Sequence, residues 1–270
     1  MLARVKQTLS DWLGQLPLRK NIDDFNGFLF GKMLRTRLAV LLMDECADEG
    51  FLNRLTLACA ATEIAHTASL FHDDVIDGAS LRRGRPTLWK ATTPNASILT
   101  GDFLLCESLR LLAGTGNTAD VNTFVLKVRE VCFAEAEQEL LLRGKNMPAE
   151  KALQIARSKT GPLFAFPLMF CVSEATEVLE EVGYLIGTAY QLKDDILDVT
   201  GNEQTAGKTL GTDMLRSKYT LAVPDAPYPD GAQDYVEQQC SRAVELLSPW
   251  PIKQQKLQAF VDEKIAQQAV

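Results

Sequence analysis

Two clusters of aspartates share one spacing and could bind divalent cations. Their members are Asp73, Asp74 and Asp77 in DDVID, and Asp194, Asp195 and Asp198 in DDILD. Residues four apart on a helix share a face, and residues three apart nearly do. The spacing therefore predicts three carboxylates along one edge of each helix, with the intervening aliphatic residues turned into the core. Such crowded like charges destabilise a helix unless a cation neutralises them, and Mg²⁺ takes carboxylate, water and phosphate oxygens as ligands.

Basic residues surround both acidic clusters and could neutralise phosphate oxygens that share the metal ions. Arginine offers a planar fork to phosphate, and lysine offers a point charge. One such residue alone is more often a surface charge, and Arg37 and Arg85 stay closest to that interpretation. The placement of the set around two acidic motifs favours a phosphate site. Its members are Lys32, Arg35, Arg82, Arg83, Lys159, Lys208 and Lys218.

Two further polar residues precede the aspartates on the same predicted helix faces. His66 lies seven residues before Asp73, and Gln191 lies three residues before Asp194. A lone histidine on an apolar helix is usually a core residue, but this position predicts a side chain that faces the aspartates and could bond to phosphate. His72 adjoins the first cluster and is expected to point elsewhere.

Composition excludes several other classes of protein. The chain has 270 residues, of which 46% are hydrophobic, and a formal charge of −7. That charge argues against a nucleic-acid partner, and no apolar run is long enough to predict a transmembrane segment. The six cysteines lack metal-ligand spacing and indicate buried free thiols in a protein of the reducing cytoplasm.

Helical periodicity runs almost throughout the chain. Apolar residues recur at spacings of three and four, and alternating strand patterns are scarce. We therefore expect one all-α domain over residues 1–270, a bundle of about ten helices. Turn residues predict breaks between helices, including one at TGPLFAFP, where Pro162 and Pro167 lie. A proline-rich surface loop is expected over residues 220–231.

Taken together, these motifs resemble the trans-isoprenyl diphosphate synthases, or polyprenyl synthetases, and are closest in style to the long-chain members. The matching stretches are GKMLR, EIAHTASLFHDDVIDGASLRRGRPT, GDFLL, KTGPLF, YQLKDDILDVTG and GKTLGTDMLRSKYTL, which span residues 31 to 221 in family order. The resemblance implies the isoprenoid synthase-type helical bundle around a central cavity, usually as a homodimer. It also implies two or three Mg²⁺ ions held by the six aspartates.

The resemblance further implies a reaction and a role for each residue. An allylic prenyl diphosphate ionises, isopentenyl diphosphate attacks the cation, and a longer trans-polyprenyl diphosphate and free diphosphate result. Isopentenyl diphosphate is expected at Lys32, Arg35, His66 and Arg83. The allylic diphosphate is expected at Arg82, Lys159, Lys208 and Lys218, with Thr160 and Gln191 near the developing carbocation.

Product length depends on what blocks the cavity beneath the first motif. Short-chain members often place an aromatic residue five positions before the first aspartate, where this chain has Ala68. Ser69 follows it, and Ala65 lies one turn deeper. These small residues predict an open tunnel and a product of C20 or longer, with Phe103 or Leu104 as a possible floor.

Three alternatives remain open at the level of the sequence. A terpene cyclase of the same fold seldom needs the set expected at isopentenyl diphosphate, and head-to-head synthases usually space their acidic motifs differently. A catalytic or regulatory subunit of a heteromeric prenyl synthase is the third. Regulatory subunits typically lose an aspartate motif, whereas this chain keeps both. Unusual terminal regions, including FGKMLRT in place of the commoner GGKR[LM]RP, keep that alternative open.

Overall fold

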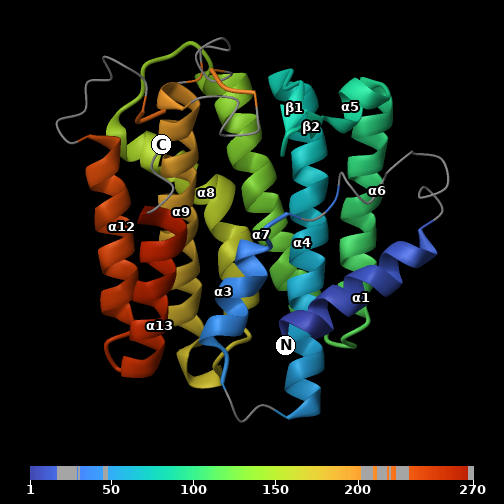
Figure 1. The fold of residues 1–270 in the computed structure, drawn as a ribbon, viewed down its shortest axis with the longest axis vertical. Coiled ribbons are helices and arrows are strands. Elements are labelled where there is room, and N and C mark those ends of the chain that lie inside the picture. Colours follow the sequence, from blue (N-terminus) through green and yellow to red (C-terminus); the bar gives the residue numbers. More distant parts are fainter. Residues whose placement is uncertain are drawn as a thin grey trace.

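The computed structural model describes residues 1–16, 29, 31–44, 48–201, 209–211, 218, 220–222 and 231–266. The regular secondary structure of this part of the chain is helical except for one short hairpin, so the all-α prediction is confirmed (Figure 1). The helices and strands are α1 (Leu2–Gln15), α3 (Leu34–Leu42), α4 (Glu49–Asp77), β1 (Leu81–Arg82), β2 (Arg85–Pro86), α5 (Leu88–Ala91), α6 (Pro94–Ala113), α7 (Thr118–Glu137), η2 (Gln138–Leu142), α8 (Ala149–Leu168), η3 (Ser173–Ala175), α9 (Thr176–Thr200), α12 (Ala232–Leu246), α13 (Pro251–Val261) and η4 (Asp262–Ala266). None of the described helices is both long enough and apolar enough to cross a membrane.

The two aspartate motifs lie at the carboxyl ends of the two longest helices, α4 and α9. Helix α4 is preceded by Asp48, whose carboxylate accepts a hydrogen bond from the Phe51 amide at 2.7 Å, and is followed by Gly78, which has a φ of +67°. These are the side-chain cap and the left-handed glycine expected at helix ends. Both helices end at the same end of the bundle (Figure 1), so the fold brings together motifs that are far apart in sequence.

Helix α8 corrects the predicted break at TGPLFAFP. It runs unbroken from Ala149 to Leu168 and holds Pro162 and Pro167 in its interior. Beside these prolines, α8 packs backbone to backbone on α9. A Cβ added at Gly187 would lie 2.7 Å from the Cα of Gly161, closer than real Cβ atoms approach their neighbours. Tertiary packing between the two helices therefore overrides the local preference of proline for a break.

The hydrophobic core has a large cluster and a smaller second one. The second cluster lies among α4, α6, α7 and α8. Small α4 residues, Ala58 and Ala61 among them, face bulky partners there, and the rings of Phe124 and Phe166 lie 4.8 Å apart. Such alternation of small and large side chains fills the space between helices closely.

Only part of the cysteine prediction agrees with the structure. Cys59, Cys171 and Cys240 are buried free thiols, but Cys106 and Cys132 are exposed on α6 and α7. Cys46 lies outside the described residues. The sequence pattern misplaces the two exposed residues because α6 and α7 also carry apolar residues on their outer faces, so periodicity alone does not identify the inner face.

Candidate active site

One cavity of about 720 Å³ opens between the carboxyl ends of α4 and α9, with walls from α7, α8 and the β1–β2 hairpin. Most of the residues singled out in the sequence line it. They are Lys32, Arg35, His66, Asp73, Asp77, Arg82, Arg83, Lys159, Thr160, Gln191, Asp194, Asp195, Asp198 and Lys218. The expected position Lys208 lies outside the described residues.

The first aspartate motif divides between the cavity and the protein interior. Asp73 and Asp77 line the cavity, and the Asp77 carboxylate accepts a hydrogen bond from Lys218 Nζ at 2.6 Å. Asp74 is only 2% exposed and is absent from the lining, whereas Ile76 is 46% exposed. The prediction of three carboxylates on one edge, with the aliphatic residues inside, is therefore wrong for this motif. The turn of α4 places the first and last aspartates toward the cavity and the middle one toward the hairpin.

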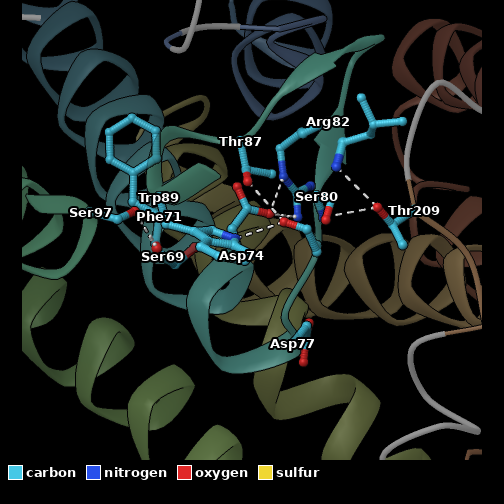
Figure 2. A network of polar contacts seen from close by, with 12 residues as sticks. Ser69, Phe71, Asp74, Asp77, Ser80, Arg82, Thr87, Trp89, Ser97 and Thr209 are labelled. Atoms are coloured by element: carbon cyan, nitrogen blue, oxygen red, sulfur yellow. Dashed lines mark hydrogen bonds and ion pairs between the residues drawn. The ribbon is translucent and has the colours of Figure 1, made fainter. Parts of the chain in front are cut away.

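Arg82 holds Asp74 in its buried position. Its Nε and Nη2 atoms lie 2.8 and 2.7 Å from the Oδ1 atom of Asp74 (Figure 2). Charge-assisted hydrogen bonds of this kind are about twice as strong as neutral ones. Burial raises the pKa of Asp74, and the Arg82 charge and hydrogen bond work against that rise. The pair therefore fixes the direction of the Arg82 guanidinium, which also lines the cavity.

Arg82 and Arg83 sit on a tight hairpin. Leu81 pairs with Pro86 and Arg82 with Arg85, so Arg83 and Gly84 form the two-residue turn. Their φ angles are +54° and +71°. Two positive φ values are typical of the hairpin turn whose twist matches its strands. Arginine in this region of φ is uncommon, and here it directs the side chain toward the chain that precedes α3, where Arg83 Nη1 donates a hydrogen bond to the Leu29 carbonyl.

The second motif is joined to α8 by a chain of hydrogen bonds. Thr160 donates its hydroxyl to the Gln191 side-chain oxygen at 2.5 Å, and Gln191 Nε2 donates to Asp195 at 2.8 Å. Gly161 lies one residue from Thr160, and Gly187 lies one turn from Gln191. The close contact of these two glycines brings α8 and α9 near enough for the chain of hydrogen bonds to form. Gln191 is thereby held through both its side-chain oxygen and its side-chain nitrogen, which orients Asp195 at the cavity wall.

Glu135 and Gln138 are among the polar residues of the cavity that the sequence interpretation missed. Lys159 Nζ lies 2.8 Å from Glu135 Oε1 and donates a 2.8 Å hydrogen bond to the side-chain oxygen of Gln138. Burial opposes the charge of Lys159, but Glu135 and Asp73 outweigh it and the net effect raises the lysine pKa. Glu135 lies among several acidic residues on α7, so only the fold distinguishes it as the partner of Lys159.

The opposite side of the cavity, near α3, is cationic. Arg35 is buried with its guanidinium carbon 4.8 Å from the centre of the Phe164 ring, and its Nε atom has no hydrogen-bond partner among the described residues. A buried donor without a partner is costly and suits an anion. Desolvation and the charges of Arg35, Arg83 and Arg82 lower the pKa of His66 well below its usual range. His66 is therefore a neutral donor or acceptor in this group at neutral pH.

The carboxylates of the cavity form a site that suits divalent cations. Burial, followed by repulsion from Glu135 and Asp77, raises the pKa of Asp73 to about 8, although Lys159 and Arg82 oppose the shift. Added positive charge would relieve that repulsion. Among the described residues, no three His, Cys, Asp or Glu side chains lie close enough to hold a metal by themselves. Carboxylates spaced in this way fit Mg²⁺, which commonly uses one or two carboxylates and takes its other ligands from water and phosphate.

The remaining wall of the cavity is apolar and comes from α7 and α8. Its residues are Val131, Ala152, Ile155, Ala156 and Leu163. Of the small α4 residues expected along a tunnel, Ser69 lines the cavity, whereas Ala65 and Ala68 are buried against the core and absent from the lining. Phe103 and Leu104 also pack on the core rather than on the cavity. The apolar depth therefore lies closer to α7 and α8 than the sequence predicted.

Comparison with known proteins yields a family and a fold. A family model described as polyprenyl synthetase matches residues 20–242. The heptaprenyl diphosphate synthase component 2 of Geobacillus stearothermophilus is 36% identical over 178 residues, which cover 64% of this chain and 56% of that protein. The octaprenyl diphosphate synthase of Escherichia coli K12 is 31% identical over 212 residues, which cover 75% of this chain and 65% of that protein. The chain thus spans less than two thirds of the length of these relatives.

A solved structure shares the fold over nearly the whole chain. It is a polyprenyl synthase from Caulobacter crescentus CB15 complexed with calcium and isoprenyl diphosphate. The two structures superpose with a TM-score of 0.84 over 99% of this chain and 95% of that chain, at 24% sequence identity. The predicted isoprenoid synthase-type bundle is confirmed by this likeness.

Proposed function

The chain belongs to the polyprenyl synthetase family, and from that premise we propose that it is a trans-polyprenyl diphosphate synthase. It condenses isopentenyl diphosphate with an allylic prenyl diphosphate to give a longer prenyl diphosphate and free diphosphate. The observation that carries the proposal is a single cavity with three distinct walls: one with the aspartates of both motifs, one that is cationic, and one that is apolar. The aspartate wall suits metal ions, the cationic wall suits diphosphate, and the apolar wall suits the hydrocarbon chain.

The allylic diphosphate belongs at the acidic wall. Asp73, Asp77, Asp194, Asp195 and Asp198 would hold Mg²⁺, which when bound stabilises the negative charge of the departing diphosphate. Asp74 is assigned to positioning Arg82 rather than to the metal, because its carboxylate is buried against that arginine. The Caulobacter relative was crystallised with calcium and isoprenyl diphosphate, which supports a divalent metal with this fold.

Cationic side chains complete the binding of the leaving diphosphate. Arg82, Lys159 and Lys218 line the acidic wall, and Lys208 is proposed from its place in the motif. These groups stabilise charge as it develops, because they are held in place before the bond breaks. The bond between the allylic carbon and the diphosphate oxygen breaks heterolytically, and both electrons leave with the diphosphate.

Isopentenyl diphosphate belongs at the cationic wall near α3. Lys32, Arg35, His66 and Arg83 line that side, and the buried Nε atom of Arg35 is a donor that no described residue of the chain satisfies. Held there, the double bond of isopentenyl diphosphate attacks the allylic cation and forms the new carbon–carbon bond. The proton that is then lost passes to the released diphosphate, so the reaction needs no side-chain base.

The cation between the two diphosphates needs polar stabilisation on one side and dry surroundings on the other. Thr160 and Gln191 lie in the wall with their oxygens oriented by mutual hydrogen bonding. Leu163 and Phe164 continue that wall as apolar surface. A water-free surface prevents quenching of the cation, and the apolar depth accommodates a growing chain. A product of C20 or longer is proposed, in keeping with the names of the heptaprenyl and octaprenyl relatives.

A homodimer is proposed through the outer face of α6, α7 and η2. Leu126, Phe133 and Leu140 follow one another at seven-residue intervals and are 61%, 64% and 78% exposed, and Leu99 on α6 is 66% exposed. Seven residues make about two helical turns, so the first three form one apolar stripe. Apolar surface of this kind marks an interaction site. A second copy is the proposed occupant, because a face lined by leucine and phenylalanine can pair with itself across a twofold axis.

A heteromeric synthase is the second candidate, because one relative is named as component 2 of a heptaprenyl diphosphate synthase. The deciding experiment incubates the purified chain alone with Mg²⁺, labelled isopentenyl diphosphate and geranyl, farnesyl or geranylgeranyl diphosphate. Labelled products longer than the primer support the proposed synthase. Activity that appears only with a partner protein supports the heteromeric subunit, and a hydrocarbon formed from the primer alone supports a terpene cyclase.

A further inference from the structure

We propose that Thr209 is a positioning residue that fastens the arginine hairpin to the segment following the second aspartate motif. Its hydroxyl oxygen accepts hydrogen bonds from the amides of Ser80 and Leu81, both at 3.0 Å, and its own amide donates to the Leu81 carbonyl at 3.1 Å. Figure 2 shows Thr209 beside the hairpin residues Ser80 and Arg82. Three hydrogen bonds thus join Thr209 to the two residues that directly precede Arg82 and Arg83.

The arrangement resembles a one-residue strand added to the edge of β1. In a sheet, a neighbouring strand supplies a carbonyl to an amide and an amide to a carbonyl. Here the Thr209 hydroxyl takes the place of the carbonyl, and the Thr209 amide supplies the donor. Because that oxygen satisfies two amides at once, its loss would leave both donors without this partner.

The other side of the hairpin is fixed independently. The Thr87 amide donates to the Ser80 carbonyl at 3.1 Å, and the side chains of Thr87 and Trp89 donate to the Ala79 carbonyl at 2.8 and 2.7 Å. These contacts hold the start of the hairpin to the chain that follows it. Among the described hydrogen bonds of Leu81, only those with Thr209 connect the β1 edge to the far side of the cavity.

The same short segment is tied to the second aspartate motif. Two residues after Thr209, the Gly211 amide donates to the Asp198 carbonyl at 3.1 Å. Gly211 has a φ of +71°, which glycine adopts without strain. Residues 209–211 therefore connect the hairpin that carries Arg82 and Arg83 to the end of α9. The hydroxyl of Thr209 sets the distance between the two halves of the diphosphate site.

This inference rests on the proposed function, since it assigns Arg82 and Arg83 to diphosphate. The test measures binding of inorganic diphosphate in the presence of Mg²⁺ by calorimetry, which does not depend on turnover. Thr209→Val keeps the shape but removes the acceptor, and should weaken diphosphate binding about 5- to 10-fold. Thr209→Ser keeps the acceptor and should bind like the wild type. Thr118→Val, an exposed hydroxyl at the far end of α7, is the matched control and should change nothing.

A double-mutant cycle separates positioning from direct contact. If Thr209 acts through the arginines, Thr209→Val should have no further effect on affinity in the Arg82→Gln/Arg83→Gln background. An equal loss in both backgrounds would overturn the inference, as would unchanged binding by Thr209→Val or a Thr209→Ser variant as weak as the valine. Steady-state kinetics should show a raised KM with kcat less affected. Wild-type protein that binds diphosphate but makes no product would contradict the proposed function and leave this test intact.

Discussion

Arg82 places two guanidinium nitrogens, Nε and Nη2, within 2.8 Å of a single carboxylate oxygen of Asp74. The contact removes the middle aspartate of the first motif from the cavity and gives it a different task from that of its neighbours. Asp73 and Asp77 keep their carboxylates toward the site, and Asp74 aims an arginine there instead. The three aspartates of one motif should therefore respond differently to the same substitution.

Asp74→Asn should raise the KM for the allylic diphosphate about tenfold or more, because Arg82 loses a charged hydrogen-bond partner. The Mg²⁺ concentration needed for half-maximal rate should change little. Asp73→Asn and Asp77→Asn should instead raise that Mg²⁺ requirement and lower kcat. Steady-state kinetics over a series of Mg²⁺ concentrations measures both quantities. If Asp74→Asn shifted the Mg²⁺ requirement as far as Asp73→Asn, the assigned division of roles would be wrong.

His66 should remain neutral at a pH where a free histidine takes up a proton. Desolvation and three arginines lower its pKa well below 6.5 in the folded protein. As pH falls below 6.5, the unfolded chain binds a proton at His66 that the folded chain does not, so stability falls with pH. The chain has only two histidines, so His72→Gln leaves a single imidazole signal for NMR. That signal should not titrate near pH 6.5, and His66→Gln should lose less stability than the wild type between pH 7.5 and 5.5.

Gly31→Ala should weaken isopentenyl diphosphate binding without unfolding the protein. A Cβ at this position would lie 2.7 Å from the guanidinium of Arg83. The neighbour is the end of a flexible side chain, so the arginine moves and the backbone does not. We expect a KM for isopentenyl diphosphate raised about fivefold, within the range of one lost hydrogen bond, and an unchanged melting temperature. A matching rise in the KM for the allylic substrate would contradict the assignment of Arg83 to one diphosphate.

Val131 should control product length in a graded way. It lines the apolar wall one turn below Glu135, so a larger side chain there fills space that a growing chain would use. Val131→Phe should shorten the longest product and Val131→Ala should lengthen it, while the first condensation keeps its rate. Chromatography of labelled products measures the distribution. Identical distributions in both variants would place the limit on chain length elsewhere.

Charge on the α7 stripe should separate the subunits of the proposed homodimer. Phe133→Glu combined with Leu126→Glu would put two like charges of each copy into the self-paired face, where a buried unpaired charge is costly. Light scattering should report a dimer for the wild type and a monomer for this variant. Ile252→Glu, at a residue 68% exposed on α13, is the control and should remain dimeric. A wild-type monomer would contradict the homodimer directly.

The sequence predicted the chemistry of the site better than its orientation. Motif spacing placed both aspartate sets on helices, and the cavity contains nearly all of the expected cations. Spacing could not show that α4 turns Asp74 inward and Ile76 outward, since a difference of one residue on a helix rotates a side chain by about 100°. Partners from distant elements, such as Glu135 for Lys159, depend on how α7 packs against α8 and leave no local pattern.

The helix break predicted at the prolines of α8 was wrong for a related reason. Propensity describes a residue in its local chain, whereas Pro162 lies in a helix held by a neighbour at backbone contact. Tertiary packing of this kind regularly overrides local preference. The glycines that permit the contact lie on both helices, 26 residues apart in sequence at Gly161 and Gly187. Only the folded structure shows that they allow the two backbones to touch.

That meeting of backbones also limits where the protein can move. Helices separated by side chains can slide as those side chains change rotamer. At Gly161 and Gly187, however, the backbones of α8 and α9 are in direct contact, with no side chain between them. The Thr160–Gln191–Asp195 side of the cavity is therefore its stationary half. Any adjustment to the lengthening substrate of the proposed reaction must therefore come from elements outside this α8–α9 contact, such as α7.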